Sequence, residues 1–130
     1  GAGIRVQHIS DDYREVIVSM KLRWYNRNYV GTHFGGSLSA MTDPFFMLML
    51  MNILGKEYIV WDQAATIKFI RPGRGRVVAR FHLDQAQIDE IHAQMQSGSV
   101  FHPEYEVEIL DEEGQVVAQV VKQEYIRKKA

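Results

Sequence analysis

Residues 28–54, NYVGTHFGGSLSAMTDPFFMLMLMNIL, predict a loop followed by a helix, and this helix decides the fold. Glycine and asparagine are frequent over residues 26–36, which is typical of a loop. From about Ser37 to Leu54 the chain is almost wholly apolar, and its methionines and leucines favour helix over strand. A helix that is apolar on every side is a buried helix. We therefore expect a long buried helix that ends at Gly55.

Alternating apolar and polar residues outside this helix predict five strands. These strands cover residues 16–24, 58–70, 76–83, 105–109 and 116–126. The turn at residues 72–75 predicts a hairpin between the second and third strands, and the turn at residues 111–114 predicts one between the last two. Asp84 is a favoured N-cap residue, so we expect a short surface helix after it.

This order of elements predicts an α+β domain in which an antiparallel sheet packs one face against one helix. The length of 130 residues fits a single domain over residues 1–130. One helix cannot cover both faces of such a sheet, and its edge strands also need partners. We therefore expect a homo-oligomer.

Composition excludes several classes of function. The chain is 46% hydrophobic and 24% charged, with a net charge of −1, so we expect neither nucleic acid nor an anionic membrane as a partner. It has no cysteine, which excludes disulfides and thiolate catalysis. The apolar run at residues 45–54 is about half the length of a membrane span. Residues 1–6 do not resemble a signal peptide, so we expect a cytoplasmic protein.

The loop and the start of the predicted helix resemble the signature of hotdog-fold thioesterases. The matching features are Asn28, Gly31, the pair Gly35-Gly36 that opens the helix, and Asp43 about seven residues further on. Residues 61–72 resemble the long strand that follows the central helix in that superfamily. Within it, THFGGSL at 32–38 with MTDPF at 41–45 is similar to the DUF4442 family. The resemblance implies an antiparallel sheet of five to six strands wrapped around one long central helix.

The resemblance also implies hydrolysis of an acyl-CoA or a related acyl thioester. Asp43 would act as general base or nucleophile, and Asn28 would orient the water or the thioester carbonyl. The backbone amides of Gly35 and Gly36, at a helix N-terminus, would polarise the carbonyl and stabilise the oxyanion. In this fold the carboxylate and the glycine amides come from neighbouring subunits, which implies a homodimer and, beyond it, a dimer of dimers (a homotetramer).

Five further residues are candidates for substrate binding. His33 and Phe34 lie in the loop, and Phe46 and Met47 could line an acyl-chain tunnel. Arg71, with its neighbouring arginines, could meet the phosphates of coenzyme A. The sequence departs from the phenylacetyl-CoA branch at two of these positions. Phe34 stands where that branch has a histidine, and Arg71 stands where it often has serine or threonine.

Each assignment has a structural alternative. Asp43-Pro44 has the composition of an N-cap followed by a first helical residue, so Asp43 could only cap the helix. The glycine pair could be a tight turn, His33 a loop or core residue, and the arginines a solvated turn. The five histidines show no metal-ligand spacing, so we expect no metal and no cofactor. Two other functions stay open, namely a non-catalytic acyl-CoA-binding protein and a hotdog dehydratase.

Overall fold

The computed structural model describes residues 3–22, 41–71, 75–98 and 100–129. Its elements are the strands β1 (Ile4–Ile9) and β2 (Glu15–Leu22), the helix α2 (Phe45–Leu54), the strands β3 (Tyr58–Phe69) and β4 (Gly75–His82), the helix α3 (Gln85–Ser97), and the strands β5 (Val100–Phe101), β6 (Glu104–Leu110) and β7 (Val116–Lys128).

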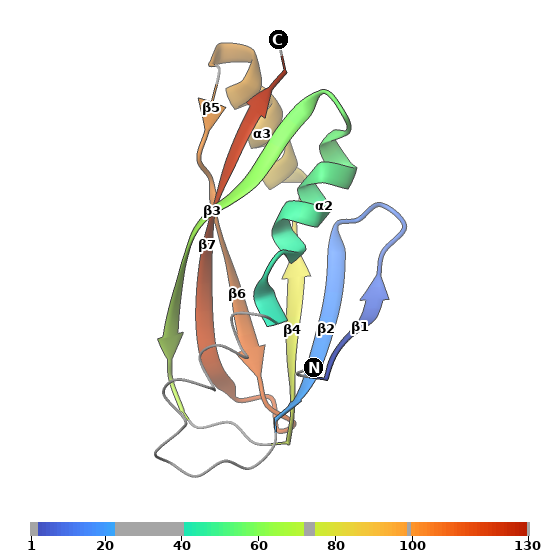
Figure 1. Cartoon of the computed structure of the whole chain (residues 1–130), viewed down its shortest axis with the longest axis vertical. Coiled ribbons are helices and arrows are strands. Elements are labelled where there is room, and N and C mark those ends of the chain that lie inside the picture. Colours follow the sequence, from blue (N-terminus) through green and yellow to red (C-terminus); the bar gives the residue numbers. More distant parts are fainter. Residues whose placement is uncertain (1–2, 23–40, 72–74, 99, 130) are drawn as a thin grey trace.

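The strands form one antiparallel sheet that curls around α2. Their order is β1-β2-β4-β6-β7-β3, and the short β5 pairs with β7 off this path. In Figure 1, β1 and β2 lie on one side of α2, and β3 and β7 lie on the other. The prediction of an antiparallel α+β sheet wrapped around a central helix is therefore confirmed.

The predicted hairpin between β3 and β4 is wrong. β4 pairs with β2 along its whole length and with β6 at Val78 and Ala79, while β3 lies at the far end of the sheet beside β7. The predicted hairpin of β6 and β7 is present. Pro-Gly turns fix where the chain reverses, but they do not select the partner of the next strand. Here β4, the strand that follows β3, lies across α2 from β3 and pairs with β2.

Helix α2 begins later and is less buried than the sequence predicts, and the predicted helical residues 37–40 lie outside the described residues. Residues 41 and 42 are helical, residues 43 and 44 form a turn, and α2 begins at Phe45. Proline lacks an N–H and cannot continue the hydrogen bonding of a preceding turn, so the interruption at Pro44 has a local cause. Leu48 and Met51 remain 42% and 47% exposed. The sheet covers only one side of the helix, so the prediction of a helix buried on all sides is wrong for the single chain.

The core lies between α2 and the concave face of the sheet. Phe46 is fully buried, and its ring meets the edge of Phe81 at a centroid distance of 5.0 Å. It also contacts Tyr105 on β6 at 5.5 Å. Burying an aromatic side chain stabilises a fold by roughly 1.5–3 kcal/mol, so these contacts fix α2 against the sheet.

The predicted surface helix after Asp84 is present as α3. The Asp84 carboxylate accepts a hydrogen bond from the backbone N–H of Gln87, and the Gln87 side chain accepts one from the backbone N–H of Asp84. This capping box satisfies two amides that would otherwise lack partners at the helix start. Ile88, Ile91 and Met95 form the buried side of α3, which packs near β5.

Candidate active site

The edge strand β3 and its neighbour β7 place charged side chains on the face that packs against α2. Asp62 on β3 and Glu124 on β7 are direct partners in the antiparallel register. Lys122 lies two residues before Glu124, and Val120 and Ile126 continue the same buried row. Side chains two apart on a strand point to the same face. Lys122 and Glu124 therefore enter the core between apolar residues.

Asp43 meets these side chains from the turn that precedes α2. Its Oδ1 accepts a hydrogen bond of 3.0 Å from Nζ of Lys122. The same Nζ lies 3.7 Å from Oδ2 of Asp62. Lys122 thus bridges a carboxylate beside the helix and one on the sheet. We call Asp43, Asp62, Lys122 and Glu124 the acid–lysine cluster.

Exposure falls steeply along the cluster. The Asp43 side chain is 55% exposed and that of Asp62 is 19% exposed. The Lys122 side chain is 4% exposed, and Glu124 is fully buried. The cluster therefore runs from an accessible carboxylate at the surface to an inaccessible carboxyl in the core.

This gradient sets different proton affinities for the three carboxyl groups. The side chain of Asp62 and then the hydrogen bond from Lys122 hold the pKa of Asp43 below its ordinary value. Burial raises the pKa of Asp62, and the neighbouring Asp43 adds to that rise. Burial, followed by the contact with Asp62, raises the pKa of Glu124 to about 9. At neutral pH Asp43 is therefore ionised, whereas Glu124 carries a proton.

The hydrogen bonding of the buried end agrees with this charge state. When all carboxyls are ionised, both oxygens of Glu124 and Oδ1 of Asp62 have no hydrogen-bond partner among the described residues. Two carboxylates can only accept, so their contact becomes a hydrogen bond when one of them holds a proton. A proton on Glu124 can be donated to Oδ1 of Asp62, which gives that oxygen and one of the two Glu124 oxygens a partner.

The surroundings of Glu124 contribute apolar surface and a neutral phenol. Tyr105 on β6 lies opposite Lys122 through β7 pairing and is 5% exposed. Burial, with the nearby charges of Glu90 and Glu124, raises the pKa of the Tyr105 hydroxyl, so it stays protonated. Phe46 packs against the Tyr105 ring at a centroid distance of 5.5 Å. This low-polarity environment strengthens every charge interaction in the cluster.

Of the residues that the sequence singled out, the structure brings Asp43 into this cluster. Its role as an N-cap is wrong, because Pro44 is the N-cap of α2 without a side-chain hydrogen bond, and the Asp43 carboxylate binds Lys122 instead. Phe46 is buried in the core, Met47 is half-buried, and Arg71 is exposed. Asn28, His33, Phe34, Gly35 and Gly36 lie outside the described residues.

Sequence reasoning missed Asp62, Lys122 and Glu124. A signal for two of them was present, because Lys122 and Glu124 share the parity of Val120 and Ile126 within an alternating strand. On a strand whose alternate residues are apolar and buried, a charged residue at one of these buried positions is unusual unless it is paired. For Asp62 the signal was weaker, because a bulge at Gln63 shifts the register of β3 directly after it.

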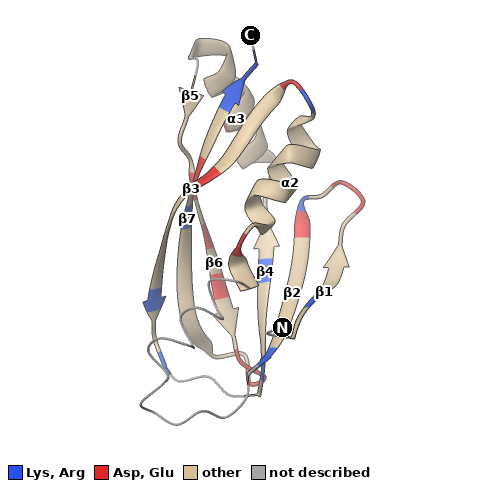
Figure 2. Ribbon diagram, in the orientation of Figure 1, with Lys and Arg blue, Asp and Glu red and all other residues tan. Residues whose placement is uncertain are grey.

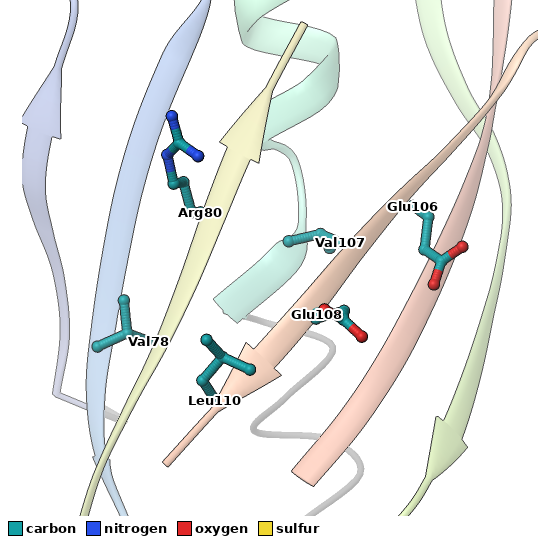
Figure 3. Close-up of a pocket in the computed structure, with 6 residues that line it drawn as sticks. All are labelled: Val78, Arg80, Glu106, Val107, Glu108 and Leu110. Carbon is teal, nitrogen blue, oxygen red and sulfur yellow. The ribbon is translucent and has the colours of Figure 1, made fainter. Parts of the chain in front are cut away.

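A second concave feature lies on the opposite face of the sheet. A hollow of about 430 Å³ lies between β4 and β6, lined by Val78, Arg80, Glu106, Val107, Glu108 and Leu110. Figure 3 shows these side chains where the two strands diverge. Glu106 and Glu108 alternate with buried residues of β6 and so face away from Tyr105. Figure 2 shows acidic and basic residues interspersed over the strands. The hollow contains none of the residues of the acid–lysine cluster.

Metal and membrane features are absent from the described part of the chain. No group of three or more His, Asp or Glu residues there is arranged to hold a metal ion. None of the helices described has the length and apolar character that crossing a bilayer requires.

Solved structures with the same fold define the class of this protein. PA5026 of Pseudomonas aeruginosa, a protein of unknown function described as a "probable thioesterase", is 20% identical with a TM-score of 0.78, covering 98% of this chain and 84% of that one. The thioesterase HI1161 of Haemophilus influenzae is 14% identical with a TM-score of 0.63, covering 98% and 80%. PaaI of Escherichia coli, from the phenylacetic acid degradation operon, is 18% identical with a TM-score of 0.62, covering 99% and 81%. The chain has the hotdog fold.

The family follows from the sequence match. The model of DUF4442, a domain of unknown function, matches residues 1–126. The chain therefore belongs to the DUF4442 family, as the residues around Gly35-Gly36 and Asp43 predict. No protein with a curated description matches it.

Proposed function

We propose that this protein hydrolyses acyl thioesters, with acyl-CoA as the leading substrate and Asp43 as general base or nucleophile. The observation that carries the proposal is the state of Asp43. It is an accessible carboxylate whose pKa is lowered and whose position is fixed by Lys122. A carboxylate of this kind is ionised at neutral pH and available to a substrate.

The reaction fits these residues. In one route Asp43 takes a proton from water while the water oxygen forms a bond to the thioester carbonyl carbon. In the other route Asp43 attacks the carbonyl itself, and water then hydrolyses the resulting anhydride. In both routes the C–S bond breaks, the thiolate leaves and takes up a proton, and the products are a carboxylic acid and a thiol.

Other parts of the machinery are carried over from the family resemblance. The amides of Gly35 and Gly36 would polarise the carbonyl, and Asn28 would orient it or the water. His33, Phe34, Phe46, Met47 and Arg71 would contact the substrate. Phe46 packs between Phe81 and Tyr105, so an acyl chain would have to run along the exposed side of α2 past Leu48 and Met51 or displace that ring.

A homodimer is part of the proposal. β3 pairs only with β7 among the described strands, so its other edge is open over twelve residues. Trp61 and Phe69 on this strand are 56% and 47% exposed. The opposite edge strand, β1, has six residues, a register shift between Val6 and His8 and the charged Arg5. Strand β3 also has a bulge and charged residues, but it is twice as long and exposes a large aromatic side chain, and a long edge with exposed apolar residues pairs readily with another chain. The geometry favours a twofold dimer through β3, and pairing two dimers through the exposed side of α2 would give a tetramer.

The direct test is hydrolysis of a panel of acyl-CoAs by the wild type and by Asp43→Asn. We expect turnover for some chain lengths and a loss of at least about 100-fold in the variant, the scale of a lost acid–base group. Asp84→Asn is the matched control. It removes a carboxylate of α3, keeps a good N-cap residue, and should retain activity.

Two outcomes would contradict the proposal. An active Asp43→Asn protein would remove Asp43 from the mechanism. A folded, oligomeric wild type that turns over no acyl-CoA would favour a non-catalytic acyl-CoA-binding protein, which equilibrium binding of the same panel would then reveal.

A further inference from the structure

The buried half of the acid–lysine cluster has no part in the mechanism described above. Asp62, Lys122 and Glu124 are too enclosed to meet a large substrate, yet Lys122 joins them to Asp43, the accessible carboxylate of the cluster. Burying several charged groups is costly unless they are paired. Their presence on the buried face of β3 and β7 therefore requires an explanation beyond packing.

We propose that Lys122, Asp62 and Glu124 are positioning residues that hold the Asp43 carboxylate ionised and in one orientation, with a proton shared between Asp62 and Glu124. The catalytic consequence rests on the proposed function, whereas the effect on the ionisation of Asp43 does not.

The geometry gives Lys122 the central place. Its Nζ lies 3.0 Å from Asp43 and 3.7 Å from Asp62, so one ammonium faces two carboxyl groups. Lys122 is nearly inaccessible, and strand β7 with its neighbours β3 and β6 restricts where its side chain can go. A cation held in this way attracts Asp43 more strongly than an exposed lysine would, because the ammonium is removed from water and its position is fixed.

The proton shared by Asp62 and Glu124 keeps the cluster from repelling itself. With every carboxyl ionised, three negative charges would face a single positive charge. A proton on Glu124 leaves Asp43 and Asp62 facing Lys122, and it converts an unsatisfied carboxyl pair into a hydrogen bond. The ammonium of Lys122 then faces two negative charges, those of Asp43 and Asp62, rather than three.

The other titratable group that faces the cluster does not compete for this role. Among the described residues, Tyr105 of β6 packs beside Glu124 and remains neutral, and α2 contributes the apolar Phe46. Glu90 of α3 is exposed and acts on Tyr105 rather than on Asp43. Lys122 is thus the cation whose removal should change the proton affinity of Asp43.

The test measures the Asp43 carboxyl directly by ¹³C NMR titration, in the wild type and in Lys122→Met. We expect the pKa of Asp43 to rise by at least about one unit, a tenfold change in proton affinity. Lys122→Arg, which keeps the charge, should hold the pKa near its wild-type value. An Asp43 pKa that is the same in all three proteins would overturn the proposal.

Lys122→Met alone can unfold the protein, because it leaves three carboxyls without a cation. The comparison is therefore repeated in the Glu124→Gln background, where one carboxyl is already a neutral amide of the same shape. There too, Lys122→Met should raise the pKa of Asp43 by about one unit. No rise between these two folded proteins would again overturn the proposal.

Kinetics separate this inference from the proposed function. If the wild type hydrolyses acyl-CoA, Lys122→Met should move the acidic limb of the kcat profile to higher pH and leave KM nearly unchanged, and Lys122→Arg should restore the profile. If the acidic limb lies at the same pH in Lys122→Met as in the wild type, the positioning role is rejected and the thioesterase proposal is unaffected. If the wild type is inactive, the thioesterase proposal fails, and the NMR titration still decides whether Lys122 sets the ionisation of Asp43.

Discussion

The two faces of the sheet differ at two neighbouring residue pairs of β3 and β7, in the reverse of the usual pattern. On the inner face, Asp62 and Glu124 oppose each other in the core. One residue along each strand, on the outer face, Trp61 and Tyr125 oppose each other and stack at 5.1 Å. Charge therefore lies inside and an aromatic pair lies outside, although a sheet with one solvated face usually has apolar residues inside and polar residues outside.

This reversal indicates two separate demands on the same strands. Buried charges destabilise a fold unless they are paired, so the inner face is best explained by the carboxylate of Asp43 that it supports. An exposed aromatic pair on a long open edge indicates contact with another chain. The contrast separates a site for chemistry from a surface for assembly, and three predictions test that separation.

The largest effect is expected on the inner face. Lys122→Met should lower the free energy of unfolding by about 3–5 kcal/mol, because it leaves buried acidic groups without their cation. Arg80→Met is the matched control, since Arg80 is an exposed cation paired with Glu15 on the sheet surface. It should cost less than about 1 kcal/mol. Urea unfolding of both variants measures the difference, and equal losses would mean that burial does not distinguish the two cations.

An intermediate effect is expected on the outer face. Trp61→Ala should weaken the dimer by about 2–4 kcal/mol, or roughly 30- to 1000-fold in dissociation constant, if this ring is a hot spot of the interface. Sedimentation equilibrium measures the change. Val6→Ala on the opposite edge strand is the control and should leave the dimer intact. A dimer that survives Trp61→Ala would place the interface elsewhere.

The smallest effect is expected for Glu124→Gln near pH 4. Because the folded-state pKa of Glu124 is raised to about 9, its side chain is neutral in the folded protein there and is mostly protonated in the unfolded chain as well, so the amide should change stability by less than about 1.5 kcal/mol.

The pH dependence should change much more. A carboxyl with a raised folded-state pKa stabilises the protein fully below its ordinary pKa, and this stability is lost as pH rises through about 9. The wild type should therefore lose stability from about pH 5 to pH 9, and Glu124→Gln should lose less over that range. Thermal unfolding across this range measures both slopes, and parallel curves would contradict a protonated Glu124.

The sequence predicted most of the elements but not how they are joined. Strands β2, β3, β4, β6 and β7 were visible because alternation is a local property, and α3 because Asp84 and Gln87 form a local cap. Strands β1 and β5 were missed. Residues 4–9 mix Arg5, Gln7 and His8 with apolar residues on an exposed edge, and β5 has only two residues. Strand alternation contains no information on which strand lies beside which.

For the candidate site, sequence alone determined the family pattern that leads to Asp43, since the residues at 28–43 lie in one stretch. The tertiary structure decided that Asp43 meets Lys122 from a strand 79 positions away rather than capping its own helix. It also decided that Asp62 faces inward, directly before a bulge at Gln63 that reverses the alternation of β3. The physical reason is that local patterns set which residues are helical, extended or turning. Proton affinities depend instead on burial and on charges brought together by long-range strand pairing.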